Sequence, residues 1–283
     1  MFEHRISGII PSVIAFAYST KEDGSPNIIG TGFSVATIEE KRAGLFATCL
    51  HVAEELKELK GLNGAELKKE GLIDNKRRIA LFKTETFEWQ EVNPIRFSSL
   101  IKVGESNFAK VHDVCICRIP EIDLPPLPLS PNKYFIGREL GIIGFPVFDK
   151  LQRISVQPFA IKTILSSHMH YPFERDGKQI VSERLALGCV VGPGFSGSPV
   201  FSIRDGTIVG MVDYLPPEVY FGDIKFREPS LYEADIRVPI PAGISLAIPS
   251  TLIQKCLDYC SKMDWEDPSF EEYSIEQSYS IDK

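Results

Sequence analysis

Apolar residues along the chain gather in short runs that are separated by turn-forming glycine, proline, aspartate and serine residues. In the first half, such runs predict strands at 9–18, 30–36, 45–52, 79–83, 87–92 and 111–119. In the second half, similar runs predict strands at 139–144, 155–165, 185–191, 199–203, 208–213 and 244–248. Short strands with turns between them favour barrels or sandwiches over alternating strand and helix units.

A proline-rich segment divides these strands into two groups. Residues 120–131 contain Pro120, Pro125, Pro126, Pro128 and Pro131, and a stretch of this composition predicts an extended linker because proline cannot donate to a sheet. We therefore predict two domains and a tail. The domains are 1–122, with a charged helical excursion at 54–78, and 123–263, which ends in a helix; the flexible acidic tail is 264–283.

Composition narrows the function classes. The net charge is −7, which argues against nucleic-acid and anionic-membrane partners. The N-terminal residues lack a basic segment followed by a long apolar core, and no apolar run is long enough for a membrane span, so we expect neither a signal peptide nor membrane association. Six cysteines in 283 residues predict no disulfide framework, and we expect a reducing, cytoplasmic setting.

The candidate chemistry centres on a glycine-flanked serine. Ser196 lies between Gly194 and Gly197 in the segment 192–201, GPGFSGSPVF. Glycines on both sides permit backbone conformations that direct several N–H groups to one point, as an oxyanion hole requires. Because Gly/Ser turns are common in β proteins, this pattern alone leaves an ordinary tight turn as an equal alternative.

A serine nucleophile needs a base and an orienting carboxylate. His51 ends one apolar run, and Asp113 precedes another. Taken alone, His51 also fits a histidine packed in the core, and Asp113 also fits an exposed aspartate at a strand edge. His168 and His170 lie in a polar segment without a nearby acid or thiol, so we predict surface residues and no metal site. His51 and Asp113 precede the proline-rich segment and Ser196 follows it, which is the arrangement that a cleft between two barrels would use.

Six motifs in this order resemble the chymotrypsin-like serine protease family, and most closely its bacterial Deg/HtrA-like branch without a PDZ domain. They are 30–33 (GTGF), 47–52 (ATCLHV), 112–116 (HDVCI), 141–146 (GIIGFP), 194–200 (GFSGSPV) and 243–249 (GISLAIP). The resemblance spans about residues 9–263. It implies an all-β fold of two six-stranded Greek-key barrels with a C-terminal helix.

The resemblance also implies roles. Ser196 attacks the scissile carbonyl, His51 transfers its proton and Asp113 orients His51, while the N–H groups of Gly194 and Ser196 form the oxyanion hole. A substrate pocket is implied with Val190 at its base and Asp213 and Gly243 in its walls, and its apolar base predicts small or medium apolar side chains at P1. No cofactor is implied.

One departure concerns activation. Phe195 stands where secreted digestive members carry an aspartate that pairs with a new N-terminus, so we expect no activation of that kind. The oxyanion loop is then either ordered in advance or ordered by an activating partner, which the sequence does not identify.

The sequence favours a serine endopeptidase that acts on a protein or peptide substrate. Two alternatives remain open. A catalytically silent protease fold would bind peptides in the same cleft, and an esterase would use the same chemistry on small molecules.

Overall fold

The structure is a computed structural model. It describes residues 2–20, 25–38, 43–61, 79–83, 88–91, 96–97, 102–103, 106–107, 112–120, 122–147, 157–175, 178–213, 220–225, 235–240 and 243–260. Among the helices described, none is both long and apolar enough to cross a lipid bilayer.

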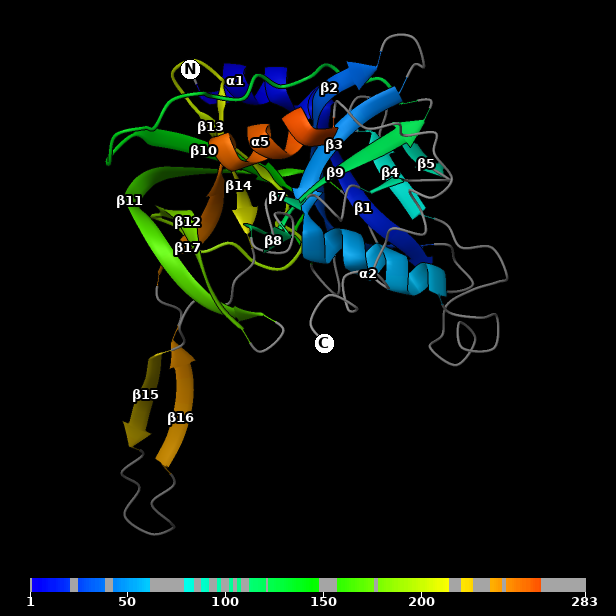
Figure 1. Cartoon of the computed structure of the whole chain (residues 1–283). Helices are drawn as coiled ribbons and strands as arrows, with labels where there is room; N and C mark the ends of the chain where they lie inside the picture. Colours follow the sequence, from blue (N-terminus) through cyan, green and yellow to red (C-terminus); the bar gives the residue numbers. More distant parts are fainter. Residues whose placement is uncertain are drawn as a thin grey trace.

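The first half is built on an antiparallel sheet (Figure 1). Seven strands pair in the order β5-β4-β1-β2-β3-β9-β6. Their bounds are β1 Val13–Thr20, β2 Ser25–Ile38, β3 Ala43–Cys49, β4 Ile79–Lys83, β5 Glu88–Glu91, β6 Arg96–Phe97 and β9 Val114–Pro120. Helix α2, Leu50–Gly61, follows β3 directly, and β7, Lys102–Val103, pairs with β8, Ser106–Asn107.

The N-terminus differs from the strand predicted at 9–18. Helix α1, Phe2–Ile9, is followed by a 3-10 turn, Ile10–Ser12, and β1 begins only at Val13. Pro11 lies within this turn, where its fixed φ is tolerated and its missing N–H costs no ladder hydrogen bond. The apolar residues before Val13 therefore pack from helical turns, a distinction that short apolar runs do not make in sequence.

The second half is a closed barrel. Its six strands follow one another around the barrel in the order β10-β11-β12-β17-β14-β13. Their bounds are β10 Glu139–Gly144, β11 Phe159–Arg175, β12 Lys178–Leu187, β13 Pro199–Ser202, β14 Ile208–Asp213 and β17 Ser245–Pro249. A hairpin of β15, Tyr220–Lys225, and β16, Asp235–Ile240, extends away from the barrel in Figure 1.

Helix α5, Ser250–Cys260, ends the described chain and lies across the region where the halves meet (Figure 1). One hydrophobic core runs through both halves: it contains Phe16 and Phe46 from the first, Phe201 and Met211 from the second, and Ile253 from α5. Burial of this continuous apolar surface fixes the halves against each other.

The proline-rich segment is held to both halves. The Leu127 N–H donates to the Ser34 carbonyl at 2.9 Å, and the Ser130 N–H donates to the Ile208 carbonyl at 2.8 Å. The hydroxyl of Ser250, the first residue of α5, donates to the Ser130 carbonyl at 2.7 Å. The linker is therefore an ordered part of the junction between the two halves.

The predicted class is confirmed: the protein is mostly β, with a closed six-stranded barrel, a second sheet and a C-terminal helix. In detail the first half differs from the six-stranded barrel expected, because its described strands form a seven-stranded sheet. The domain limits at 122 and 263 stay predictions. Residues 62–78 of the predicted excursion and the tail at 264–283 lie outside the described residues.

Candidate active site

His51 is fixed by the junction between a strand and a helix. Strand β3 ends at Cys49 and α2 begins at Leu50, so His51 stands in the first turn of the helix rather than at a strand end. Its ring is 36% exposed, whereas the Asp113 side chain is only 9% exposed. The imidazole is thus open on one side and backed by a buried carboxylate.

Asp113 contacts His51 with both carboxylate oxygens. His51 Nδ1 lies 2.7 Å from Asp113 Oδ2, and the backbone N–H of His51 donates to Oδ1 at 3.1 Å. An ionised carboxylate only accepts, so Nδ1 carries the proton of this bond and Nε2 is left as the basic nitrogen. This tautomer is the one that a general base acting through Nε2 requires.

The backbone at Asp113 adopts a left-handed conformation, with φ of 58°. Among residues other than glycine, aspartate and asparagine tolerate this region best. The Asp113 carbonyl accepts the Leu50 N–H at 3.1 Å. The backbone before His51 is therefore also hydrogen-bonded to the backbone of Asp113.

Ser196 lies in a turn held by two glycines. Gly194 has φ of +89° and Gly197 has φ of +85°, and a Cβ at either position would collide with a backbone oxygen, that of Phe145 or that of Thr31 respectively. The Gly197 N–H donates to the Val212 carbonyl at 2.9 Å. Within the described residues, no hydrogen bond engages the N–H groups of Gly194 and Ser196, so both are available to an incoming oxyanion.

Thr31, which the sequence analysis did not single out, braces this turn from the other half. Its hydroxyl donates to the Gly194 carbonyl at 2.8 Å and accepts the Phe145 N–H at 3.1 Å, while its own N–H donates to the Ser196 carbonyl at 2.7 Å. Thr48 in turn donates its hydroxyl to the Thr31 carbonyl at 2.8 Å. In the sequence, the two glycines on either side of Thr31 indicate that another segment approaches closely. The structure shows that a Cβ at Gly30 would meet the Ser196 carbonyl oxygen.

Phe195 supplies a second anchor. Its side chain is buried and packs into the barrel's own hydrophobic cluster, together with residues of β10, β12 and β13. The turn is therefore ordered by an apolar side chain and by neutral hydrogen bonds, in place of an ion pair. The expectation that activation does not depend on a new N-terminus stays a prediction.

Asp213, predicted in a pocket wall, has its side chain turned into the protein. Its carboxylate is buried and accepts the Nε–H of Arg184, a fully buried arginine on β12, at 2.7 Å. Burial, with the nearby Asp113 charge adding to it, raises the pKa of Asp213 to about 7, although Arg184 acts in the opposite direction. Arg184 was missed in sequence because it sits in a polar stretch that reads as an exposed strand face.

The other predicted pocket residues lie on two segments that meet. Val190 is 49% exposed, and Gly243, with φ of +77°, is also exposed. The N–H of Val191 donates to the Ser245 hydroxyl at 2.9 Å and so ties the two segments together. Because 214–219 and 241–242 lie outside the described residues, the substrate pocket stays a prediction.

Four possible metal ligands gather at the pair. One ligand atom each from Cys49, His51, Asp113 and Asp213 lies within 4.8 Å of the others. Their contacts already use the His51 Nδ1 and Asp213 Oδ2 atoms. Burial, with the charges of Asp113 and Asp213, raises the pKa of the Cys49 thiol, so its sulfur is neutral and donates to the Val212 carbonyl at 3.2 Å. These contacts do not fit a resident ion.

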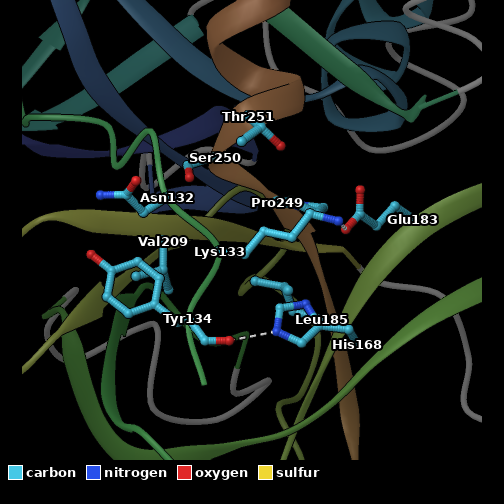
Figure 2. A pocket seen from close by; sticks show the side chains of 10 residues that line it. All are labelled: Asn132, Lys133, Tyr134, His168, Glu183, Leu185, Val209, Pro249, Ser250 and Thr251. Atoms are coloured by element: carbon cyan, nitrogen blue, oxygen red, sulfur yellow. Dashed lines mark hydrogen bonds and ion pairs between the residues drawn. The ribbon is translucent and has the colours of Figure 1, made fainter. Parts of the chain in front are cut away.

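A separate pocket lies on the barrel (Figure 2). Within it, His168 Nε2 donates to the Tyr134 carbonyl at 2.6 Å, and Lys133 pairs with Glu183 at 2.8 Å. Its lining shares no residue with the predicted catalytic or substrate set and comprises Asn132, Lys133, Tyr134, His168, Glu183, Leu185, Val209, Pro249, Ser250 and Thr251.

Comparison with known proteins identifies a family and finds similar solved structures. A family model described as a trypsin-like peptidase domain matches residues 30–211. The Rv3671c protease from M. tuberculosis in its active form is 14% identical, with a TM-score of 0.53, and the match covers 90% of this chain and 82% of that one. No curated protein matches the chain.

Two further structures of the same protease are similar. An inactive form is 13% identical with a TM-score of 0.50, and covers 90% of this chain and 92% of that one. An inactive serine-to-alanine mutant from M. tuberculosis H37Rv is 12% identical with a TM-score of 0.52, and covers 92% of both chains. At this level of identity these likenesses show a shared fold.

Proposed function

The chain belongs to the trypsin-like peptidase family and is a serine protease, and we propose that it hydrolyses peptide bonds through a triad of His51, Asp113 and Ser196. The observation that carries this proposal is the double contact between His51 and Asp113, at 2.7 and 3.1 Å. These contacts give His51 the tautomer of a general base. His51 and Asp113 belong to the first half of the chain, as does Thr31, whose N–H donates to the Ser196 carbonyl.

Catalysis then proceeds in two balanced steps. Ser196 Oγ forms a bond to the substrate carbonyl carbon as its proton passes to His51 Nε2. The C–N bond breaks, and the proton leaves with the amine, so that an acyl-enzyme remains. Water repeats the sequence: it gives a proton to His51, attacks the ester carbon and releases the acid, and the proton returns to Ser196.

The oxyanion of each tetrahedral intermediate is assigned to the N–H groups of Gly194 and Ser196. Hydrogen bonds from a preorganised turn strengthen as negative charge develops, and loss of one such donor costs about 3–4 kcal/mol of transition-state stabilisation. Support comes from the positive φ of Gly194 and from the anchoring of the turn by Thr31 and Phe195.

Substrate preference and setting complete the proposal. We propose an apolar P1 preference from Val190, with Gly243 in the pocket wall; the hydrogen bond from the Val191 N–H to the Ser245 hydroxyl, which joins their two segments, supports this proposal. The six cysteines are in the thiol state, which suits the proposed cytoplasmic location and its reducing conditions. The substrates are proteins or peptides; we propose no nucleic-acid, membrane or cofactor requirement.

The test is to map the new termini that the full chain generates in a mixture of natural peptides. We expect cleavage by the native protein and none by Ser196→Ala. Ser198→Ala is the matched control, because Ser198 lies in the same turn and its buried hydroxyl makes no hydrogen bond within the described residues.

Each outcome decides one part. Equal cleavage by Ser196→Ala would overturn the triad. Hydrolysis of small esters without peptide cleavage would favour the esterase, and peptide binding without turnover would favour a silent binding module. Termini that follow arginine or lysine would overturn the apolar P1 preference and leave the triad standing.

A further inference from the structure

The Arg184–Asp213 pair leaves one buried oxygen unexplained. Both side chains are almost fully buried, at 0% and 1% exposure, and Arg184 Nε–H uses only the Oδ2 atom of Asp213. Within the described residues, Asp213 Oδ1 is buried and meets no N–H or hydroxyl donor. A buried carboxylate oxygen without a donor is costly, so a carboxylic acid proton is the group that fits there.

The Asp113 carboxylate lies close to the Asp213 carboxyl group. One oxygen of each carboxyl group belongs to the cluster whose atoms lie within 4.8 Å of one another, and the Asp113 charge acts on Asp213. Two carboxylates in one buried site cannot both ionise readily, because like charges and burial both oppose it. A single proton between them removes the conflict.

Asp113 is the member that stays ionised. Both of its oxygens accept hydrogen bonds from His51, one from the ring and one from the backbone N–H. Among the described residues, Asp213 accepts a hydrogen bond from Arg184 alone. With His51 neutral, an ionised Asp113 and a protonated Asp213 leave the buried group with no net charge, since Arg184 carries the balancing positive charge.

We propose that Asp213 is a positioning residue for the triad, a neutral carboxylic acid held by Arg184 that donates its Oδ1 proton to the Asp113 carboxylate. This inference rests on the proposed function. Arg184 also donates from Nη2 to the His112 carbonyl at 3.2 Å, directly before the left-handed backbone of Asp113. Arg184 is further held through Nη1 by the Ser182 hydroxyl at 2.6 Å. The barrel thereby holds both the side chain and the backbone of Asp113.

The ionisable groups around Asp213 decide its response to pH. Arg184 faces it from β12, Asp113 from the residue before β9, His51 from α2 and Cys49 from β3. The buried Cys49 thiol stays neutral, so the proton that this cluster loses as pH rises is that of Asp213. Burial and the Asp113 charge, partly offset by Arg184, raise the pKa of Asp213 into the neutral range, where its loss of a proton would add a second negative charge behind His51.

The first test needs no turnover. In the full chain carrying Ser196→Ala and ¹³C-labelled aspartate, the Asp213 carboxyl resonance is identified by its loss in Asp213→Asn and followed by NMR across pH. We expect it to show the protonated form well above the pH at which ordinary aspartates ionise. An Asp213 signal that stays ionised from weakly acidic pH upward overturns the proposal, whatever the activity of the protein.

The second test separates positioning from packing. Asp213→Asn keeps a donor toward Asp113, whereas Asp213→Leu keeps the volume and removes the donor. We expect Asp213→Asn to retain kcat within about threefold, and folded Asp213→Leu to lose about 10- to 100-fold in kcat with KM little changed. Asp205→Asn, an exposed aspartate paired with Arg138, is the matched control.

The outcomes for the two Asp213 variants distinguish a positioning role from a role in packing. Equal losses in Asp213→Asn and Asp213→Leu, or no loss in either, would overturn the positioning role. If the native protein cleaves nothing, the proposed function fails, and the NMR titration still decides the protonation of Asp213.

Discussion

The two braces that cross between the halves differ in their chemistry. The Ser196 turn is held across the junction by Thr31 through uncharged hydrogen bonds, and within its own barrel by the buried ring of Phe195. Asp113 is held from the opposite direction, by Arg184 and Asp213 of the barrel. Each half thus positions a catalytic group of the other half. The brace on Ser196 contains no ionisable group, whereas the brace on Asp113 includes the proton of Asp213.

The difference predicts different responses to pH. A hydroxyl and an aromatic ring do not titrate in the working range, so the oxyanion loop keeps its order at any moderate pH. The proposed hydrogen bond from Asp213 to Asp113 exists only while Asp213 carries its proton, whereas the Arg184 contact to the His112 carbonyl does not depend on that proton.

The largest loss of activity is expected at Asp113, which the Arg184–Asp213 pair holds. Asp113→Asn keeps the shape of the side chain, but its amide donates toward His51 and favours the wrong tautomer. We expect kcat to fall about 10⁴-fold with the fold intact. Steady-state kinetics with circular dichroism would check this; a loss below tenfold would mean that Asp113 does not orient His51.

Removing the arginine tests how much the charged brace contributes to stability. Arg184→Met leaves the Ser182 hydroxyl, the His112 carbonyl and Asp213 without their buried donor. We expect the free energy of unfolding to fall by about 3 kcal/mol.

Urea unfolding measures this, and the control is the double variant Arg184→Met with Asp213→Leu. Since an apolar pair can replace a buried polar one, that protein should recover part of the stability. A double variant less stable than Arg184→Met would contradict this view of the pair.

The uncharged brace is tested at Thr31. Thr31→Val removes a hydroxyl that joins the Gly194 carbonyl and the Phe145 N–H, so the oxyanion turn should loosen. We expect kcat/KM to fall about 10- to 100-fold, by the same factor at every pH. Thr31→Ser keeps the hydroxyl and is the control. A loss in Thr31→Val that changes with pH would contradict the view that the Thr31 brace does not titrate.

The smallest effect is on stability against pH. Folded Asp213 keeps its proton until its raised pKa of about 7, whereas the unfolded chain releases it near the ordinary aspartate value. Between these values the folded protein binds more protons, so Asp213 makes the free energy of unfolding decrease as pH rises. Urea titrations at several pH values should show a flatter dependence in Asp213→Asn, and an unchanged slope would contradict the raised pKa.

The sequence was informative where chemistry is local. The glycines around Ser196 and the apolar runs before His51 and after Asp113 are patterns of neighbouring residues, and the strand-rich class followed from the same patterns. The structure joins His51 to Asp113 through the pairing of β3 with β9, which no local pattern encodes.

The braces could not be predicted for a related reason. Asp213 ends an apolar strand and Arg184 stands among polar residues, and neither position reveals its partner across the molecule. The N-terminal helix was missed because residues 2–12 carry too few apolar positions to separate a helix from a strand.

The most direct measurement of the central claim is covalent labelling of the full chain with a fluorophosphonate, followed by peptide mapping of the adduct. We expect a single adduct on Ser196 that is absent in Ser196→Ala, strongly reduced in His51→Ala and unchanged in Ser198→Ala. An adduct on another residue, or labelling of Ser196 that persists at the native rate without His51, would contradict it.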